Sequence, residues 1–279
     1  MNNQIKTVLF LGLLTGIVLA IGSFWGYSGL VIALVLVLLM NFFSYFYSDK
    51  LVLKMYKAKE VKEKDQPELY KIVKAVVHLA GVPMPKVYIV ESSNPNAFAT
   101  GRSPNHAAVA VTTGILELLE KDELKGVIAH EISHIKNRDI LISTIAATIA
   151  GVISFVGIMA RWSALFGGFG GRDGDNNIIT LLVLGILTPI MAVFIQMAIS
   201  RSREYLADEN AAKILHNPHG LINALEKLEM GSKRSPLKFG SKAGASLFIV
   251  NPFNFSGLSK LLSTHPSVED RVRKLKSLS

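Results

Sequence analysis

The chain has 279 residues, of which half are hydrophobic and 18% are charged. This charged fraction is below the roughly 25% of soluble domains, and the mean hydropathy is +0.37. An integral membrane protein is therefore the leading class. It has no cysteine, which excludes disulfides, thiolate metal ligands and a cysteine nucleophile. The net charge of +9 favours an anionic partner. Because the lysines cluster beside apolar runs and no aromatic-interleaved basic motif is present, we expect anionic phospholipid and no nucleic acid.

The first predicted elements are two apolar helices. Residues 7–48 hold no charged side chain, and at 1.5 Å per residue this stretch is long enough to cross a membrane core of about 30 Å twice. The sequence WGYSG at 25–29 supplies a break with aromatic side chains suited to an interface. We expect helices at about 7–25 and 29–47, forming a transmembrane hairpin over residues 1–48. A cleaved signal peptide is the alternative for the first helix, but a clear cleavage site followed by a polar region is missing.

Residues 49–139 are predicted to form a polar segment with both helices and strands. Its lysine-rich start, 50–64, lies near anionic headgroups or is a solvated linker. The sequence QPELYKIVKAVVHLAG has helical periodicity, with Gly81 and Pro83 as a stop. KVYIVE and AAVAVTT are typical of strands, and helix resumes in GILELLEKDELKGVIAHEISHIKNRD.

Two more uncharged stretches, 140–160 and 178–200, predict a second transmembrane hairpin with a short glycine-rich outer loop. Their small residues suit close helix packing in a membrane, and a buried hairpin of a soluble core is the alternative. Positive charges follow the second and fourth apolar stretches, so the positive-inside rule places both termini and residues 49–139 in the cytoplasm. Residues 201–279 are expected to be a cytoplasmic helical segment. The predicted fold is a mostly α membrane protein with four transmembrane helices and a cytoplasmic α+β domain with a small sheet.

The motif H-E-x-x-H stands at 130–134. Residues four apart share one face of a helix, so His130 and His134 can reach one ion, while Glu131 stands where its carboxylate can act on the attacking water. This is the zinc-protease motif, and a pair of surface or core histidines is the alternative reading. A catalytic zinc site needs a third protein ligand and an open position, and the following HIKNRD does not supply a third histidine.

The third ligand is expected from the segment SREYLAD at 202–208. Glu204 comes shortly after the fourth apolar stretch, just as His134 comes shortly before the third, so an antiparallel hairpin makes them neighbours. Only about 9 Å of helix separates His134 from Ile140, which places the metal near the membrane surface on a helix expected to continue into the membrane. Asp208, one turn after Glu204, either orients a ligand histidine or is a solvated aspartate.

These residues predict hydrolysis of peptide bonds. Zinc would polarise the scissile carbonyl and lower the pKa of water to about 7, and Glu131 would pass the water proton to the leaving amine. The oxyanion needs a further donor. The sequence alone offers His265, Arg271, Tyr205 and others for this role and does not rank them.

The chain resembles the HtpX membrane metalloproteases, gluzincins related to the CAAX prenyl proteases. Four motifs carry the resemblance over nearly the whole length and stand in the family's order: NAFATG at 96–101, HEISH at 130–134, SREYLAD at 202–208 and HPSVEDR at 265–271. The resemblance implies a zincin-like domain with one Zn²⁺ per chain, bound by His130, His134 and Glu204. It also implies Glu131 as general base and Asp208 as a support for the ligands.

The resemblance extends to the oxyanion and the substrate. It implies that His265 and Arg271 help to stabilise the oxyanion, whereas the alternative is a helical turn with a solvated arginine. The stretch Asn96, Ala97, Phe98 corresponds to a segment near the substrate cleft, where an extended peptide would pair with a strand edge. The family further implies quality control of misfolded or damaged membrane proteins in the bacterial cell membrane, often under stress.

Two other functions stand as alternatives to a membrane-embedded zinc endopeptidase with a cytoplasmic active site. A CAAX-type prenyl-peptide protease would need a large intramembrane chamber, for which four helices are too few. A non-catalytic membrane scaffold with structural zinc would be expected to use four, often cysteine, ligands, and the chain has no cysteine.

Overall fold

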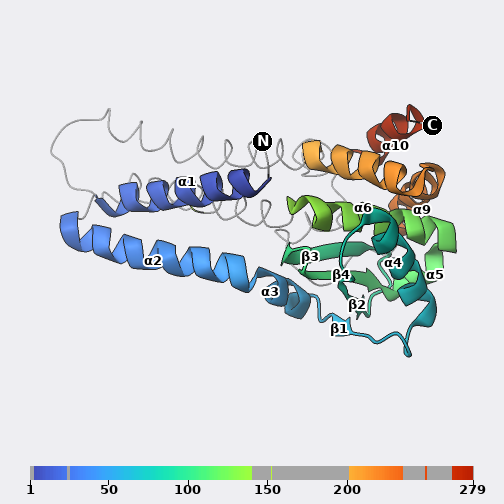
Figure 1. The fold of residues 1–279 in the computed structure, drawn as a ribbon, viewed down its shortest axis with the longest axis horizontal. Coiled ribbons are helices and arrows are strands. Elements are labelled where there is room, and N and C mark those ends of the chain that lie inside the picture. Colours follow the sequence, from blue (N-terminus) through green and yellow to red (C-terminus); the bar gives the residue numbers. More distant parts are fainter. Residues whose placement is uncertain are drawn as a thin grey trace.

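The computed structural model describes residues 3–23, 26–139, 152, 201–234, 249 and 266–278. Its elements, in chain order, are α1 (Asn3–Ser23), α2 (Gly26–Phe46), α3 (Ser48–Met55), β1 (Lys59–Glu60), α4 (Pro67–Ala80), β2 (Lys86–Val90), β3 (Ala97–Ser103), β4 (His106–Thr112), α5 (Thr113–Leu118), α6 (Lys121–Asn137), α9 (His219–Arg234) and α10 (Val268–Lys276). A further helical segment covers 201–215. The hairpin of α1 and α2 extends from one side of a body that holds the sheet and the other helices (Figure 1).

The hairpin of α1 and α2 is apolar, as the sequence predicts. Within α2 the stretch Gly26–Phe43 has a mean hydropathy of 2.2 and is long enough to cross a membrane, and α1 contributes the shorter apolar stretch Leu11–Ser23. The two helices approach closely at Gly22, where a side chain would collide with Ala33, and Asn41 donates a hydrogen bond to Thr15 across the pair. Small residues and polar bridges of this kind hold helices together in lipid. Apart from residue 152, the expected third and fourth apolar helices, 140–160 and 178–200, lie outside the described residues.

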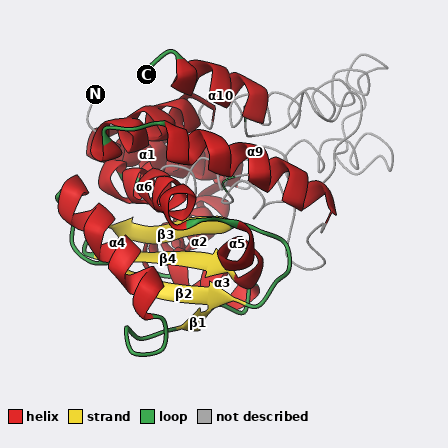
Figure 2. Cartoon of the chain, turned by 90° about the vertical axis from the view of Figure 1, so that its right-hand side faces the viewer, coloured by secondary structure: helices red, strands yellow, loops and turns green. Residues whose placement is uncertain are grey.

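The sheet has four strands in the order β1-β2-β4-β3. Strands β2 and β4 are parallel, whereas β1 pairs with β2 and β3 pairs with β4 in antiparallel fashion. Side chains alternate between the two faces of a strand. Ala97 and Ala99 therefore pack in the main core with α4 and α6, and Phe98 packs on the other face with Tyr56 and the side chains of α3. Figure 2 shows α4 and α3 on opposite faces of the sheet, with α6 beside β3.

The mostly helical fold with a small sheet is confirmed, but two strands, the short β1 and β3, were not anticipated. Strand β3 lies in the stretch SSNPNAFATGRSPNH, between the two predicted strands. Its sequence AFATGRS is rich in alanine and glycine, which are uncommon in strands. Pairing with β4 nevertheless forms the strand, and Gly101 provides a backbone φ of 134° at the irregularity between Gly101 and Ser103.

Helix α6 is held at its start and is interrupted at its end. A capping box joins Glu120 and Glu123 at the N-terminus, and Lys227 of α9 forms an ion pair with Glu123 at 2.8 Å. The helix ends at Asn137 because Arg138 adopts the left-handed conformation (φ 57°, ψ 32°). The expectation that this helix continues into the membrane is therefore wrong, since a left-handed residue turns the chain out of the helix.

Candidate metal centre

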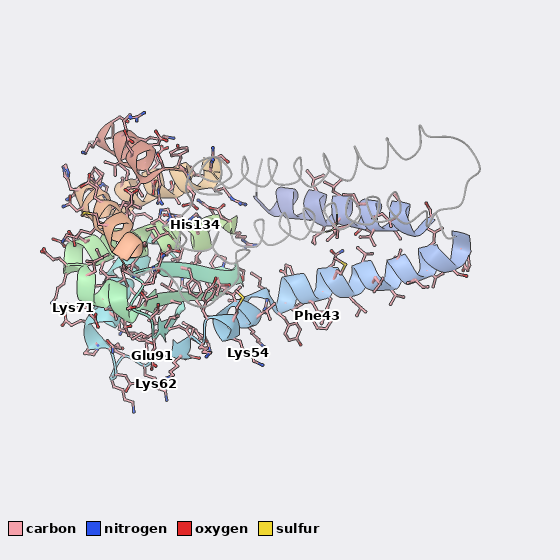
Figure 3. The ribbon with its side chains drawn as sticks, turned by 180° about the vertical axis from the view of Figure 1, so that it is seen from behind. Phe43, Lys54, Lys62, Lys71, Glu91 and His134 are labelled. Atoms are coloured by element: carbon pink, nitrogen blue, oxygen red, sulfur yellow. The ribbon has the colours of Figure 1, made fainter. Side chains whose placement is uncertain are left out.

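The structure brings the residues of H-E-x-x-H together with the segment 201–215. His130 and His134 lie one turn apart near the end of α6, and Glu204 faces them from the neighbouring helical segment. The His130 and His134 Nε2 atoms are 3.2 Å apart. Glu204 Oε2 lies 3.7 Å from His130 Nε2, and Oε1 lies 3.5 Å from His134 Nε2. In Figure 3, His134 lies in the part of the body that adjoins the apolar hairpin.

Each histidine has a carboxylate behind it. Asp208 Oδ1 is 2.9 Å from His130 Nδ1, and Asp139 Oδ2 is 3.1 Å from His134 Nδ1. A carboxylate accepts hydrogen bonds, so the Nδ1 atom of each ring carries the proton and donates it. When both rings are neutral, as histidine metal ligands are, the two Nε2 atoms present lone pairs to each other and face the Glu204 carboxylate.

Three acceptor atoms that face one another fit a cation. One ligand atom from each of His130, His134 and Glu204 lies within 4.8 Å of the others. Ligand atoms about 2.0–2.2 Å from a tetrahedral zinc ion lie about 3.3–3.6 Å apart, close to the separations seen here. Two imidazoles and a carboxylate also form a donor set typical of catalytic zinc. The residues therefore fit a zinc ion.

Arg271 of α10 is buried behind His130, with 1% of its surface exposed. Its guanidinium binds Asp208 through two bonds, from Nε to Oδ2 at 2.8 Å and from Nη2 to Oδ1 at 2.7 Å. Its Nη1 donates to the Ile249 carbonyl at 2.6 Å and lies 3.6 Å from Glu204 Oε2. The alternative of a solvated arginine is excluded by this burial. His265, predicted to act with Arg271, lies outside the described residues.

The charge of Arg271 keeps Asp208 ionised. Burial by itself would raise the pKa of Asp208, but the nearby guanidinium and its hydrogen bonds outweigh burial and lower this pKa. Asp208 is 3% exposed, so the alternative of a solvated aspartate is also excluded. A buried carboxylate paired in this way is a strong acceptor for the His130 Nδ1–H group.

Burial raises the pKa of Glu131 to about 7, and the Glu204 charge adds to this rise. His134, a hydrogen bond from the Ala99 backbone and Arg271 act in the opposite direction. A carboxylate with a pKa near neutrality can both accept a proton and return it at physiological pH. This property suits Glu131 to the role of a general acid–base catalyst.

The site favours positive charge at His134, whereas burial lowers the pKa of His130. Burial acts to lower the pKa of His134, yet the hydrogen bonds to Asp139 and Glu204 outweigh burial and raise this pKa to about 10. The group of carboxylates around His134 thus stabilises a cation at the place where a metal ion would bind.

The predicted substrate segment forms the start of the edge strand β3. Asn96 is fully buried, and its Oδ1 accepts a hydrogen bond from the Ala97 N–H. The Asn96 carbonyl accepts from Thr112 N of β4, so the Ala97 carbonyl faces the outer edge of the sheet, where it accepts from Ile249 N at 3.2 Å. The Phe98 ring lies 5.5 Å from the Tyr56 ring on the face opposite α6. The Phe98 side chain is therefore directed away from α6, and the Ala97 carbonyl is already paired on its outer side with Ile249.

Asp139 is the site residue that the sequence analysis missed. An acidic residue shortly after H-E-x-x-H is a weak signal, and a continuous helix would direct it away from His134. Only the turn at Arg138 places it beside the ring.

Comparison with known proteins gives consistent matches. Residues 63–279 match Peptidase family M48. The chain is 53% identical over 278 residues to a "Protease HtpX homolog" of Desulfatibacillum aliphaticivorans, a match that covers 99% of this chain and 89% of the relative. A protein of the same name from Pyrococcus furiosus is 52% identical over 276 residues, which are 99% of this chain and 96% of the relative.

Among solved structures, the chain resembles the crystal structure of S. mikatae Ste24p, with a TM-score of 0.60 at 20% sequence identity. The match covers 98% of this chain and 65% of that chain, so the present chain corresponds to about two thirds of the longer protein. At this identity the likeness concerns the fold.

Proposed function

The chain belongs to peptidase family M48, and from this we propose that it is a membrane-embedded, zinc-dependent endopeptidase that acts at the cytoplasmic face of the cell membrane. Membership of the family, together with relatives of about half identical sequence over the whole chain, makes it a metallopeptidase. The observation that carries the proposal is the convergence of His130, His134 and Glu204, with the carboxylate of Glu131 on the same helical turn.

In the proposed mechanism, one zinc ion held by His130, His134 and Glu204 would polarise the scissile carbonyl and lower the pKa of the attacking water. Glu131 takes the proton of this water and delivers it to the leaving amine, and the Ala99 backbone holds the Glu131 carboxylate. Asp208 and Arg271 orient the His130 ring from behind.

An oxyanion role for His265 and Arg271 stays a prediction. The contacts of Arg271 with Asp208 and Ile249 favour a role in positioning the His130 side of the site. The segment Asn96, Ala97, Phe98 is proposed to lie beside an extended substrate peptide, because it leads into β3, an edge strand of the sheet.

We propose four transmembrane helices, with both termini and the active site in the cytoplasm. The proposed segments of the chain are those predicted from the sequence: transmembrane hairpins over 1–48 and 140–200, and cytoplasmic segments over 49–139 and 201–279. Support comes from the apolar stretch Gly26–Phe43 and from the basic residues that follow it. Lys50 lies over the Tyr47 ring and Arg102 over the Phe46 ring, an arrangement suited to anionic phospholipid at the level of the headgroups.

The proposed substrates are misfolded or damaged membrane proteins, cleaved during quality control under stress. The resemblance to the HtpX family supports this role, since the relatives are proteases of that name. A metal centre beside the membrane and a strand edge that accepts an extended chain suit loosely folded proteins. No role in nucleic-acid binding is proposed.

The test compares the detergent-solubilised full-length protein with Glu131→Gln. Both are stripped of metal with a chelator, given zinc and incubated with a loosely folded protein. We expect both proteins to bind zinc and only the parent to cleave, because glutamine keeps the shape of Glu131 but cannot accept the proton. Equal cleavage by both would contradict the proposal, and so would zinc binding without any cleavage by the parent, as a scaffold with structural zinc predicts.

A further inference from the structure

The two histidines of the metal centre are supported in different ways. His130 is held by Asp208, which reaches it from the segment 201–215 and is itself paired with Arg271. His134 is held by Asp139, which lies only five residues further along the same chain. Asp139 is 2% exposed, so its carboxylate and the ring share an environment from which bulk water is largely removed.

This contact depends on the interruption of α6. Successive residues of an α-helix are rotated by about 100° around the axis, so a residue five positions after His134 would point about 140° away from it in a continuous helix. Arg138 has φ 57° and ψ 32°, a left-handed conformation that residues other than glycine rarely adopt. The turn brings the Asp139 carboxylate back over the last helical turn, to 3.1 Å from His134 Nδ1.

The turn is also connected to the third predicted ligand. Arg203, the residue before Glu204, donates from Nη1 to the Asp139 carbonyl at 3.4 Å. The end of α6 and the start of the segment 201–215 are thereby joined beside the site. Asp139 thus has a fixed place relative to both His134 and Glu204.

We propose that Asp139 is a positioning residue for the metal ligand His134. Its carboxylate accepts the Nδ1–H group, which fixes the tautomer and aims the Nε2 lone pair at the ion, and the left-handed turn at Arg138 places the carboxylate where it can do so. Hydrogen-bonded carboxylates of this kind raise the basicity of ligand histidines, and their loss weakens metal binding. The inference rests on the proposed zinc site.

The test measures zinc affinity in the full-length, detergent-solubilised protein by competition with a chromophoric chelator. The variants are Asp139→Ala, Asp139→Asn and His134→Ala. Asp122→Ala serves as the matched control, because Asp122 is an exposed aspartate in the first turn of the same helix. The visible spectrum of the Co²⁺-loaded proteins reports the coordination of the ion, and thermal unfolding of the metal-free proteins reports the fold.

We expect Asp139→Ala to bind zinc about 10–100-fold more weakly than the parent, with an altered Co²⁺ spectrum. Asp139→Asn should recover much of the affinity, because its amide oxygen still accepts the Nδ1–H bond. Asp122→Ala should bind like the parent.

The inference is overturned if Asp139→Ala binds zinc as tightly as the parent while His134→Ala does not bind it. It is also overturned if Asp139→Ala and Asp139→Asn lose affinity equally and both metal-free proteins unfold at lower temperature, since that result assigns a purely structural role. Parental affinity in His134→Ala would overturn the zinc site of the proposed function, and this inference with it.

Discussion

At the scale of single residues, the site is a largely buried cluster of imidazoles and carboxylates. Carboxylates occupy the Nδ1 side of both histidines, and the Nε2 atoms of both rings face the Glu204 carboxylate. Burial makes such a cluster unfavourable unless a cation binds. The contribution of each ligand to metal binding can therefore be measured by the metal content of a variant that lacks it.

Glu204→Ala should remove zinc as effectively as His130→Ala. Each substitution leaves two protein ligands, and a catalytic zinc site needs three. Metal analysis of the purified variants after zinc loading and gel filtration checks this. The control is Glu209→Ala, which is expected to keep zinc, because Glu209 lies in the same helical segment but forms an ion pair with Lys213. A zinc-loaded Glu204→Ala protein would overturn the assignment of the third ligand.

Arg271→Ala should destabilise the metal-free protein by about 3–5 kcal/mol, because the Asp208 carboxylate would remain buried without a partner. Arg271→Lys should recover only part of the loss, since an ammonium group cannot reproduce the two parallel bonds to Asp208. Denaturant unfolding in detergent measures both. Arg273→Ala, on the exposed face of the same helix, should change stability little, and an equally small effect of Arg271→Ala would contradict the buried ion pair.

At the scale of elements, the metal centre depends on how closely α6 packs against its neighbours. A side chain at Gly126 would lie 2.6 Å from the Leu221 backbone nitrogen of α9. The glycine therefore sets the distance between the two helices. The ion pair between Lys227 and Glu123 joins them one turn earlier on α6.

Gly126→Ala should destabilise the protein by about 1–3 kcal/mol, the usual cost of overpacking a core, although alanine is the better helix former. Thermal unfolding in detergent provides the measurement. Gly12→Ala is the control, because a side chain at Gly12 of α1 would meet no atom within 4 Å among the described residues. A stable Gly126→Ala protein would show that α6 and α9 can separate without cost.

At the scale of the whole molecule, the apolar hairpin and the catalytic body are two parts with different surroundings. Large apolar side chains of α2 are exposed along most of its length, which is favourable in lipid and unfavourable in water. Figure 1 shows that the hairpin extends away from the body that carries the sheet. In the proposed arrangement, the membrane would surround the hairpin of α1 and α2, and the body would lie in the cytoplasm.

Val35→Arg should reduce membrane integration, because Val35 lies near the middle of Gly26–Phe43 and a central arginine costs about 2.5–3.5 kcal/mol. The fraction that resists alkaline extraction from membranes measures the effect. Leu51→Arg is the matched control: Leu51 is also exposed, but it lies in the charged helix α3. Equal extraction of the two variants would contradict a membrane-spanning α2.

Local patterns in the sequence were sufficient for the features that depend on short spacing. The apolar length of the first hairpin predicted two helices, and four-residue spacing placed His130 and His134 on one face. Topology added Glu204, because an antiparallel hairpin makes the ends of two distant stretches neighbours. By contrast, the edge strand β3 was missed, since its alanine-rich sequence acquires strand geometry only by pairing with β4.

The tertiary structure alone decided how the ligands are held. Arg271 is 141 residues from His130, and the packing of α10 buries it against Asp208 rather than leaving it in solvent. The end of α6 at Arg138 could not be predicted from the sequence, because no glycine stands there. The contact between Asp139 and His134 depends on that turn. The sequence by itself determined which residues can bind a metal, because this depends on residue type and helical periodicity. The orientation of those residues depends on burial and on contacts between distant segments, which only the folded chain provides.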